Sequence, residues 1–259
     1  HVKSILLDLS DVHQKDNDII VSPNLRIIDC SNHTESENSS ITVVILAATG
    51  SKNTNIYMEP QLKTQNDHVL PLNNPIFSMS ALTYSSVEYN KNDHHLHEYS
   101  SQIDCSIKSD TFNLLGRSLI QDTSKHSATG EVRGSVFIYN GTDKKVLCNN
   151  FHSEKVEDCE HINLGKWSKE IDLDQYQIAC FINGFDVSFK NGDDHHLKRI
   201  EVSCDLAEDK LVQEDDSIVA KVNLKSFLTD GGKNHYDVPH NIVTGYVVAF
   251  KNNSKKKKK

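Results

Sequence analysis

The chain has 259 residues, of which 37% are hydrophobic, and it carries a formal net charge of −8 at pH 7. Without the terminal run Lys255 to Lys259, 23 basic residues face 36 acidic ones, so the body lacks the basic surface that neutralises the phosphates of nucleic acids or anionic lipids. Its apolar runs are strand-sized, well short of the roughly 20 residues that a membrane-spanning helix needs. The composition therefore argues against a nucleic-acid partner and against membrane insertion.

The clearest pattern along the chain is an internal repeat. Val87 to Leu96 reads VEYNKNDHHL and Val187 to Leu197 reads VSFKNGDDHHL, while the first residues, His1 to Ile5, resemble His196 to Ile200, which begin at the end of the second copy. A repeat of this size predicts tandem domains. We expect the C-terminal half of a module over residues 1–50, complete modules over 51–141 and 142–253, and a disordered lysine tail over 254–259.

Each predicted module closes with a continuous apolar or aromatic run that ends at a turn signal. The three runs are Val43 to Ala47, Val136 to Tyr139 and Tyr246 to Phe250. Short continuous runs of this kind predict central strands that are covered on both faces.

Alternating patterns in the last module predict half-buried strands. Phe185, Val187 and Phe189 alternate with polar residues, and a similar alternation is formed by Ile218, Ala220, Val222 and Leu224. The stretch from Leu206 to Val212 fits either one face of a helix or a polar connection between strands. The whole chain is therefore expected to be all-β, built from tandem antiparallel β-sandwich modules of the jelly-roll or Ig-like type.

The six cysteines are dispersed and form no zinc-binding motif. Cys148 and Cys159 lie eleven residues apart across a polar stretch, so they are the candidates for a disulfide that staples a hairpin. The alternative is a set of free thiols.

Four Asn-x-Ser/Thr sequences are candidate glycosylation sites, and each lies in a polar or turn-like segment. They are Asn32, Asn38, Asn140 and Asn252. Together with the predicted disulfide, they favour an extracellular protein or one on a cell or virion surface.

Two histidine-rich clusters follow the repeated strand and suggest a divalent metal site; no other cofactor is expected. Their members are Asp93, His94 and His95 in the first copy, and Asp193, Asp194, His195 and His196 in the second. Imidazole and carboxylate suit zinc, copper or nickel, but neighbouring histidines in a strand point to opposite faces, so only one of each pair can join a given site. The alternative is that the aspartates cap a turn and that one histidine packs inward.

No nucleophile elbow, P-loop, dinucleotide-binding turn, zinc-protease motif or EF-hand loop occurs in the sequence. We therefore expect a non-enzymatic, structural or adhesive repeat protein that assembles with itself into a fibre, coat or matrix, by strand exchange at the half-module. The alternative is a lectin-like module that binds a glycan or a metal.

Overall fold

The computed structural model describes residues 2–9, 11–16, 18–28, 43, 45–46, 56–63, 66–69, 75, 77–89, 94–108, 111–141, 145–166, 172–189, 197–230 and 241–251. Within these ranges, 59–61, 63, 66–69 and 230 are described by their backbone alone. The described residues form antiparallel strands and one short 3-10 helix, η1 (Leu173–Gln175), with no α-helix among them. The all-β prediction is confirmed.

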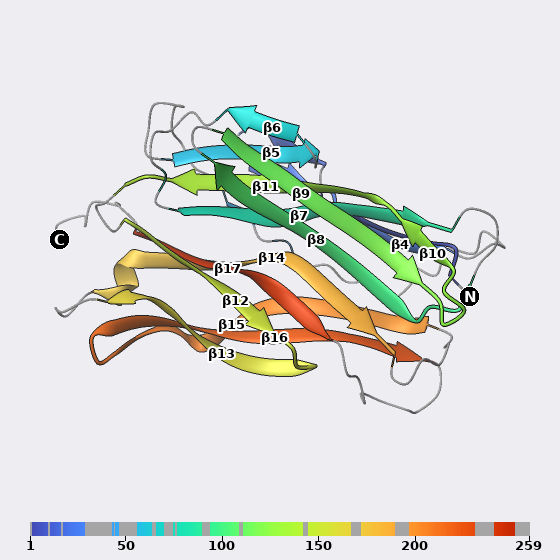
Figure 1. Ribbon diagram of the computed structural model, residues 1–259. Helices are drawn as coiled ribbons and strands as arrows, with labels where there is room; N and C mark the ends of the chain where they lie inside the picture. Colours follow the sequence, from blue (N-terminus) through green and yellow to red (C-terminus); the bar gives the residue numbers. More distant parts are fainter. Residues whose placement is uncertain are drawn as a thin grey trace.

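Two large sheets contain most of the strands (Figure 1). The five-stranded sheet has the order β4 (Asn24–Ile28), β1 (Ser4–Asp8), β7 (Phe77–Glu88), β11 (Glu131–Tyr139) and β5 (Ile56–Lys63). The seven-stranded sheet has the order β10 (Ser127–Thr129), β9 (Thr111–Gln121), β8 (Glu98–Lys108), β14 (Tyr176–Ser188), β17 (Ile242–Lys251) and β12 (Val146–Ser153), and β6 (Asn66–Val69) also pairs with β9.

Two smaller sheets complete the described fold. The three-stranded sheet has the order β13 (Glu157–Lys166), β16 (Ser217–Asp230) and β15 (Leu197–Glu214). The two-stranded sheet pairs β2 (Val12–Lys15) with β3 (Asp18–Val21). β2 follows β1 and β3 precedes β4, so β2 and β3 extend the hairpin that β1 and β4 form. Between the two strand pairs, the Ser22 N–H donates to the Asp11 carbonyl at 2.9 Å.

The alternating patterns of the sequence form strands, as predicted, and their apolar side chains are buried. Val187 is 0% exposed and Phe185 7% exposed in β14. In β16 the side chains of Ile218, Ala220, Val222 and Leu224 are all buried. The Leu206 to Val212 stretch lies within strand β15, where the register shifts between Leu206 and Leu211, so both the helix and the connection between strands are wrong.

Two of the three apolar runs are central strands with both faces covered. In β11, Val136 and Ile138 belong to one apolar core while Phe137 and Tyr139 belong to another. In β17, Val247 likewise packs in a different core from Val248. The run from Val43 to Ala47 does not follow this prediction in its described part, because Val43, Ile45 and Leu46 lie outside the strands and Ile45 is 48% exposed.

Three apolar cores hold the sheets together, and each core contains side chains from two sheets. The first joins β7 and β11 to β8 and β9, with Phe112, Ile103 and Leu114 fully buried in it. The second joins β12, β14 and β17 to β13, β15 and β16. The third joins Met79 and Phe137 of the five-stranded sheet to Phe181 and Val248 of the seven-stranded sheet.

The disulfide lies elsewhere than predicted. Cys180 of β14 is bonded to Cys204 of β15, across the second core, with a Cα–Cα distance of 6.1 Å. Cys148 and Cys159 are free thiols, so the predicted bond between them is absent. The Asn149 amide donates to the Asn163 carbonyl at 2.8 Å, which places β12 opposite a part of β13 that is several residues beyond Cys159.

One glycine allows a close approach of strands in the second core. A Cβ atom at Gly245 would lie 2.0 Å from the Phe181 carbonyl oxygen and 2.5 Å from the Phe151 ring. Only a residue without a side chain fits at this position of β17.

Candidate functional site

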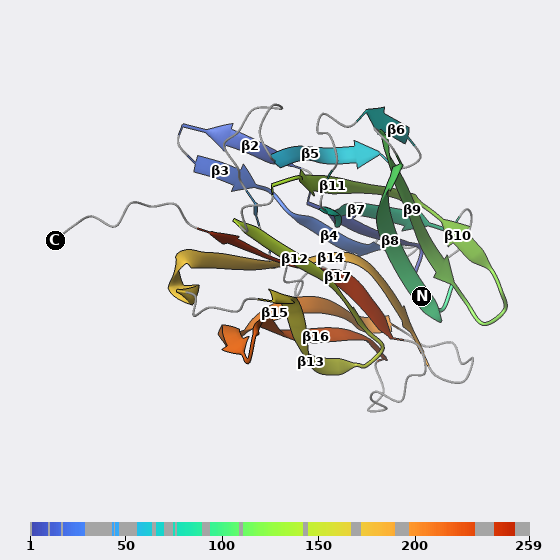
Figure 2. The ribbon, with the colours of Figure 1, turned by 60° about the vertical axis from the view of Figure 1, so that its left-hand side comes forward.

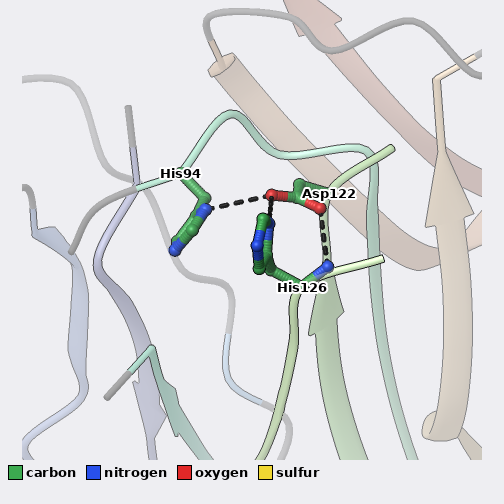
Figure 3. Close-up of side chains that lie close together, drawn as sticks. All are labelled: His94, Asp122 and His126. Carbon is green, nitrogen blue, oxygen red and sulfur yellow. Dashed lines mark hydrogen bonds and ion pairs between the residues drawn. The ribbon is translucent and has the colours of Figure 1, made fainter. Parts of the chain in front are cut away.

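A cluster of two histidines and one aspartate lies where β9 ends (Figure 3). Asp122 is the first residue after β9, His126 is the last residue before β10, and His94 lies in the connection between β7 and β8. Three ligand atoms, one from each side chain, lie within 4.8 Å of one another. The group joins two segments that are distant in the sequence.

The Asp122 carboxylate is the centre of the cluster. Its Oδ2 atom lies 3.0 Å from His94 Nδ1 and 2.7 Å from His126 Nδ1. Its Oδ1 atom accepts the backbone N–H of His126 at 2.8 Å. The carboxylate is thus fixed on one side by the turn and presents its other oxygen to both imidazole rings.

The turn between β9 and β10 has the backbone geometry that this arrangement needs. The Asp122 N–H donates to the His126 carbonyl at 3.0 Å, and the Lys125 N–H donates to the Asp122 carbonyl at 3.2 Å. Lys125 has a φ of 66°, in the left-handed region that tight turns use. These bonds bring Asp122 and His126 together although they are four residues apart.

His94 is held by its backbone as well as by its ring. Val2 and His94 exchange two backbone hydrogen bonds, of 2.7 and 2.9 Å. The His94 ring lies against the Tyr89 ring, with 4.5 Å between centroids, and against the His126 ring, with 4.7 Å. Because Tyr89 is buried in the first core, the position of His94 is coupled to the packing of the sandwich.

The electrostatics of the cluster favour an ionised carboxylate. The Asp122 side chain is 5% exposed, and burial alone would raise its pKa. The hydrogen bonds from the side chain and backbone of His126 and from His94 outweigh that burial, so the pKa of Asp122 lies below its ordinary value. The site therefore presents one buried negative charge to two ring nitrogens, a geometry that can hold protons or a cation.

Of the predicted metal ligands, the structure brings His94 into this cluster and leaves its neighbour His95 out, as expected for adjacent residues in an extended segment. Asp93, Asp193, Asp194, His195 and His196 lie outside the described residues. Asp122 and His126 were not predicted. The signal that could have indicated them is their position in a short polar turn directly after an apolar strand.

The predicted glycosylation sites are described only in part. Asn140 is half-buried and directly follows β11. Asn32, Asn38 and Asn252 lie outside the described residues.

A second candidate for function is the ribbon formed by β2 and β3, which lies at the margin of the molecule (Figure 2). Every residue of β2 is exposed, and the apolar side chains of Val12 and Ile19 are 46% and 45% exposed. In the register of the ribbon Val12 lies opposite Val21 and Gln14 opposite Ile19. Opposite residues share a face, so one face of the ribbon is largely apolar.

The fold defines an all-antiparallel β protein with a disulfide across one of its cores. Comparisons with protein-family models, with curated protein sequences and with solved structures found no match. Among the described residues, no helix is long and apolar enough to cross a membrane.

Proposed function

We propose that this protein is an extracellular, non-enzymatic structural or adhesive protein that binds further copies of itself through the β2–β3 ribbon. The observation that carries the proposal is the exposure of Val12 and Ile19 at nearly half of their surface on one face of a two-stranded ribbon. A two-stranded ribbon on its own is marginally stable, and it gains stability when its apolar face is covered. Burying the exposed halves of these two side chains would contribute roughly 1 kcal/mol each.

A second copy of the chain is the partner that we propose for this ribbon. The apolar face of one ribbon can pack on the same face of another, which gives a closed dimer, or on a different surface of the neighbour, which gives an open filament. The second arrangement corresponds to the fibre, coat or matrix that the sequence suggested.

A tandem architecture is part of the proposal, and the strand pairings support it. In the first set, β11 lies between β7 and β5; in the second set, β17 lies in the same way between β14 and β12. Likewise, β9 lies between β8 and β6 in the first set, and β16 lies between β15 and β13 in the second. The two sets of six strands therefore pair in the same chain order, which supports two successive sandwiches of one type.

The junction between the sandwiches also repeats. β1 pairs with β7 as β8 pairs with β14, and the pairs Ser4 with Glu88 and Glu98 with Ser188 occupy equivalent positions. Val87 and Val187, which the sequence repeat aligns, are 1% and 0% exposed. Successive modules are therefore joined by pairing of their strands, and a chain of modules joined in this way suits a rigid structural protein.

The Cys180–Cys204 disulfide supports an extracellular location, because such bonds persist in oxidising compartments and are rare in the cytosol.

Sedimentation velocity over a range of protein concentrations tests the proposal on the full chain. The double variant V12K/I19K places two charges on the apolar face of the ribbon and should shift the wild-type oligomers to monomers. The matched control is L115K, because Leu115 is 50% exposed on β9, away from the ribbon. A wild-type protein that stays monomeric, or an L115K variant that dissociates as completely as V12K/I19K, would overturn the proposal.

A lectin-like function is the second candidate, and it has one supporting observation. Gln102, Asp104, Leu115, Gly116 and Arg117 line a shallow depression on the β8–β9 hairpin. A carboxylate, an amide and a guanidinium beside an apolar side chain are groups that hydrogen-bond and pack against sugars. Binding on a glycan array that is lost in R117A would support this function over the first one.

A further inference from the structure

We propose that His94, Asp122 and His126 form a binding site for one divalent transition-metal ion of the zinc, copper or nickel type. The proposal is independent of the self-association described above, because the cluster lies at the β9–β10 turn and shares no residue with the β2–β3 ribbon.

The distances between the ligand atoms match those around a single ion. Metal–ligand bonds of about 2.1 Å at tetrahedral angles separate neighbouring ligand atoms by roughly 3.4 Å. Asp122 Oδ2 is 3.0 Å from His94 Nδ1 and 2.7 Å from His126 Nδ1. Small movements of the two rings away from the carboxylate would bring both of these separations to the metal-bound value, and the three ligand atoms together lie within 4.8 Å of one another.

The carboxylate provides an independent reason to expect a cation. Asp122 is 5% exposed on its side chain, and a buried carboxylate is stable only when its charge is compensated. The backbone N–H of His126 engages Oδ1, which leaves Oδ2 for the cation. A bound divalent ion compensates this charge more fully than two neutral imidazole N–H groups do.

The site is preorganised and open. His94 is fixed by its two backbone bonds to Val2, and Asp122 and His126 are fixed by the hydrogen bonds of their turn. The His126 side chain is 61% exposed and that of His94 is 23% exposed, so an ion can enter from solvent. Three protein ligands leave at least one coordination position for water or for a ligand from outside the chain.

The chemistry of the donors selects the class of metal. Two imidazole nitrogens and one carboxylate oxygen suit zinc, copper and nickel, whereas calcium and magnesium prefer oxygen ligands alone. In the bound state each Nδ1 atom would give its lone pair to the ion and the ring proton would reside on Nε2. Both rings then stay neutral and Asp122 stays ionised.

The test is cobalt and zinc binding by the full chain after treatment with a chelator. Cobalt should give visible absorption bands of a nitrogen- and oxygen-ligated ion, and titration calorimetry should detect zinc binding that weakens at least tenfold in H126A. His126 is largely exposed, so this variant should keep the fold, which circular dichroism checks. The conservative variant D122N should weaken zinc binding as well.

The matched control is H152A. His152 is also exposed and faces a carboxylate, Glu154, at 3.1 Å, but it has no third ligand among the described residues. Zinc affinity and the cobalt spectrum should be unchanged in this variant. If H126A binds both ions as the wild type does, or if H152A loses as much affinity as H126A, the cluster is not the site and its aspartate is paired with ring protons only.

Discussion

Removing the Cys180–Cys204 disulfide should lower the free energy of unfolding by about 3 to 3.5 kcal/mol. The two cysteines are 24 residues apart, and the loss of chain entropy on closing a loop of this size corresponds to about that value at 25 °C. The bond joins β14 of the seven-stranded sheet to β15 of the three-stranded sheet, so it restrains two sheets that also pack on each other through the second core. Its removal should therefore affect the whole of that sandwich.

The measurement is equilibrium unfolding in guanidinium chloride, with the oxidised wild type compared with C180A/C204A and with the reduced wild type. The reduced protein keeps the sulfur atoms in the core, so it separates the effect of the cross-link from that of side-chain truncation. C159S is the control, because Cys159 is an exposed free thiol and its substitution should change stability by less than about 0.5 kcal/mol. A difference below about 1 kcal/mol between the oxidised and reduced wild type would refute the reasoning.

Two further predictions concern charge and packing. The pKa of Asp158 is lowered to about 2, because hydrogen bonds from Lys155, Ser153 and Glu160 outweigh the burial that would raise it. The ionised Asp158 side chain therefore stabilises the fold above pH 4, and this contribution, up to roughly 2 kcal/mol, should be lost as the pH falls from about 4 to 2. D158N should flatten this part of the curve of unfolding free energy against pH. A curve that is unchanged in D158N would contradict the role given to Asp158. Gly245→Ala should destabilise the protein by more than about 3 kcal/mol or prevent folding, because the new Cβ would lie 2.0 Å from the Phe181 carbonyl oxygen. A thermal unfolding midpoint for this variant that equals that of the wild type would show that β14 and β17 are farther apart than described.

The fold class was predictable because the local patterns agree with the final environment of the side chains. Phe185 and Val187 alternate with polar residues and are buried in β14, and Ala220, Val222 and Leu224 do the same in β16. The continuous run at Val136 to Tyr139 indicated a strand that packs on both faces, and its alternate residues do enter two different cores. The spacing of apolar residues indicates which side chains are buried, and this pattern of burial is what distinguishes a strand from a helix in the sequence.

Pairings between distant segments were not predictable in the same way. Cys148 and Cys159 are close in sequence, but the disulfide joins Cys180 to Cys204 because β14 and β15 face each other across the second core. Asp122 and His126 carry no recognisable motif, and they meet His94 only because the β9–β10 turn lies beside the β7–β8 connection. Neither contact is encoded in a local pattern.

Negative-stain electron microscopy of the purified wild-type protein, with and without chelator, beside V12K/I19K, is the most direct test of the proposed self-association. We expect regular filaments or sheets in the wild type that survive chelation, and dispersed compact particles in the variant. Dispersed particles in the wild type would contradict assembly into a filament or sheet, and assemblies that persist in the variant would contradict the role of the β2–β3 ribbon.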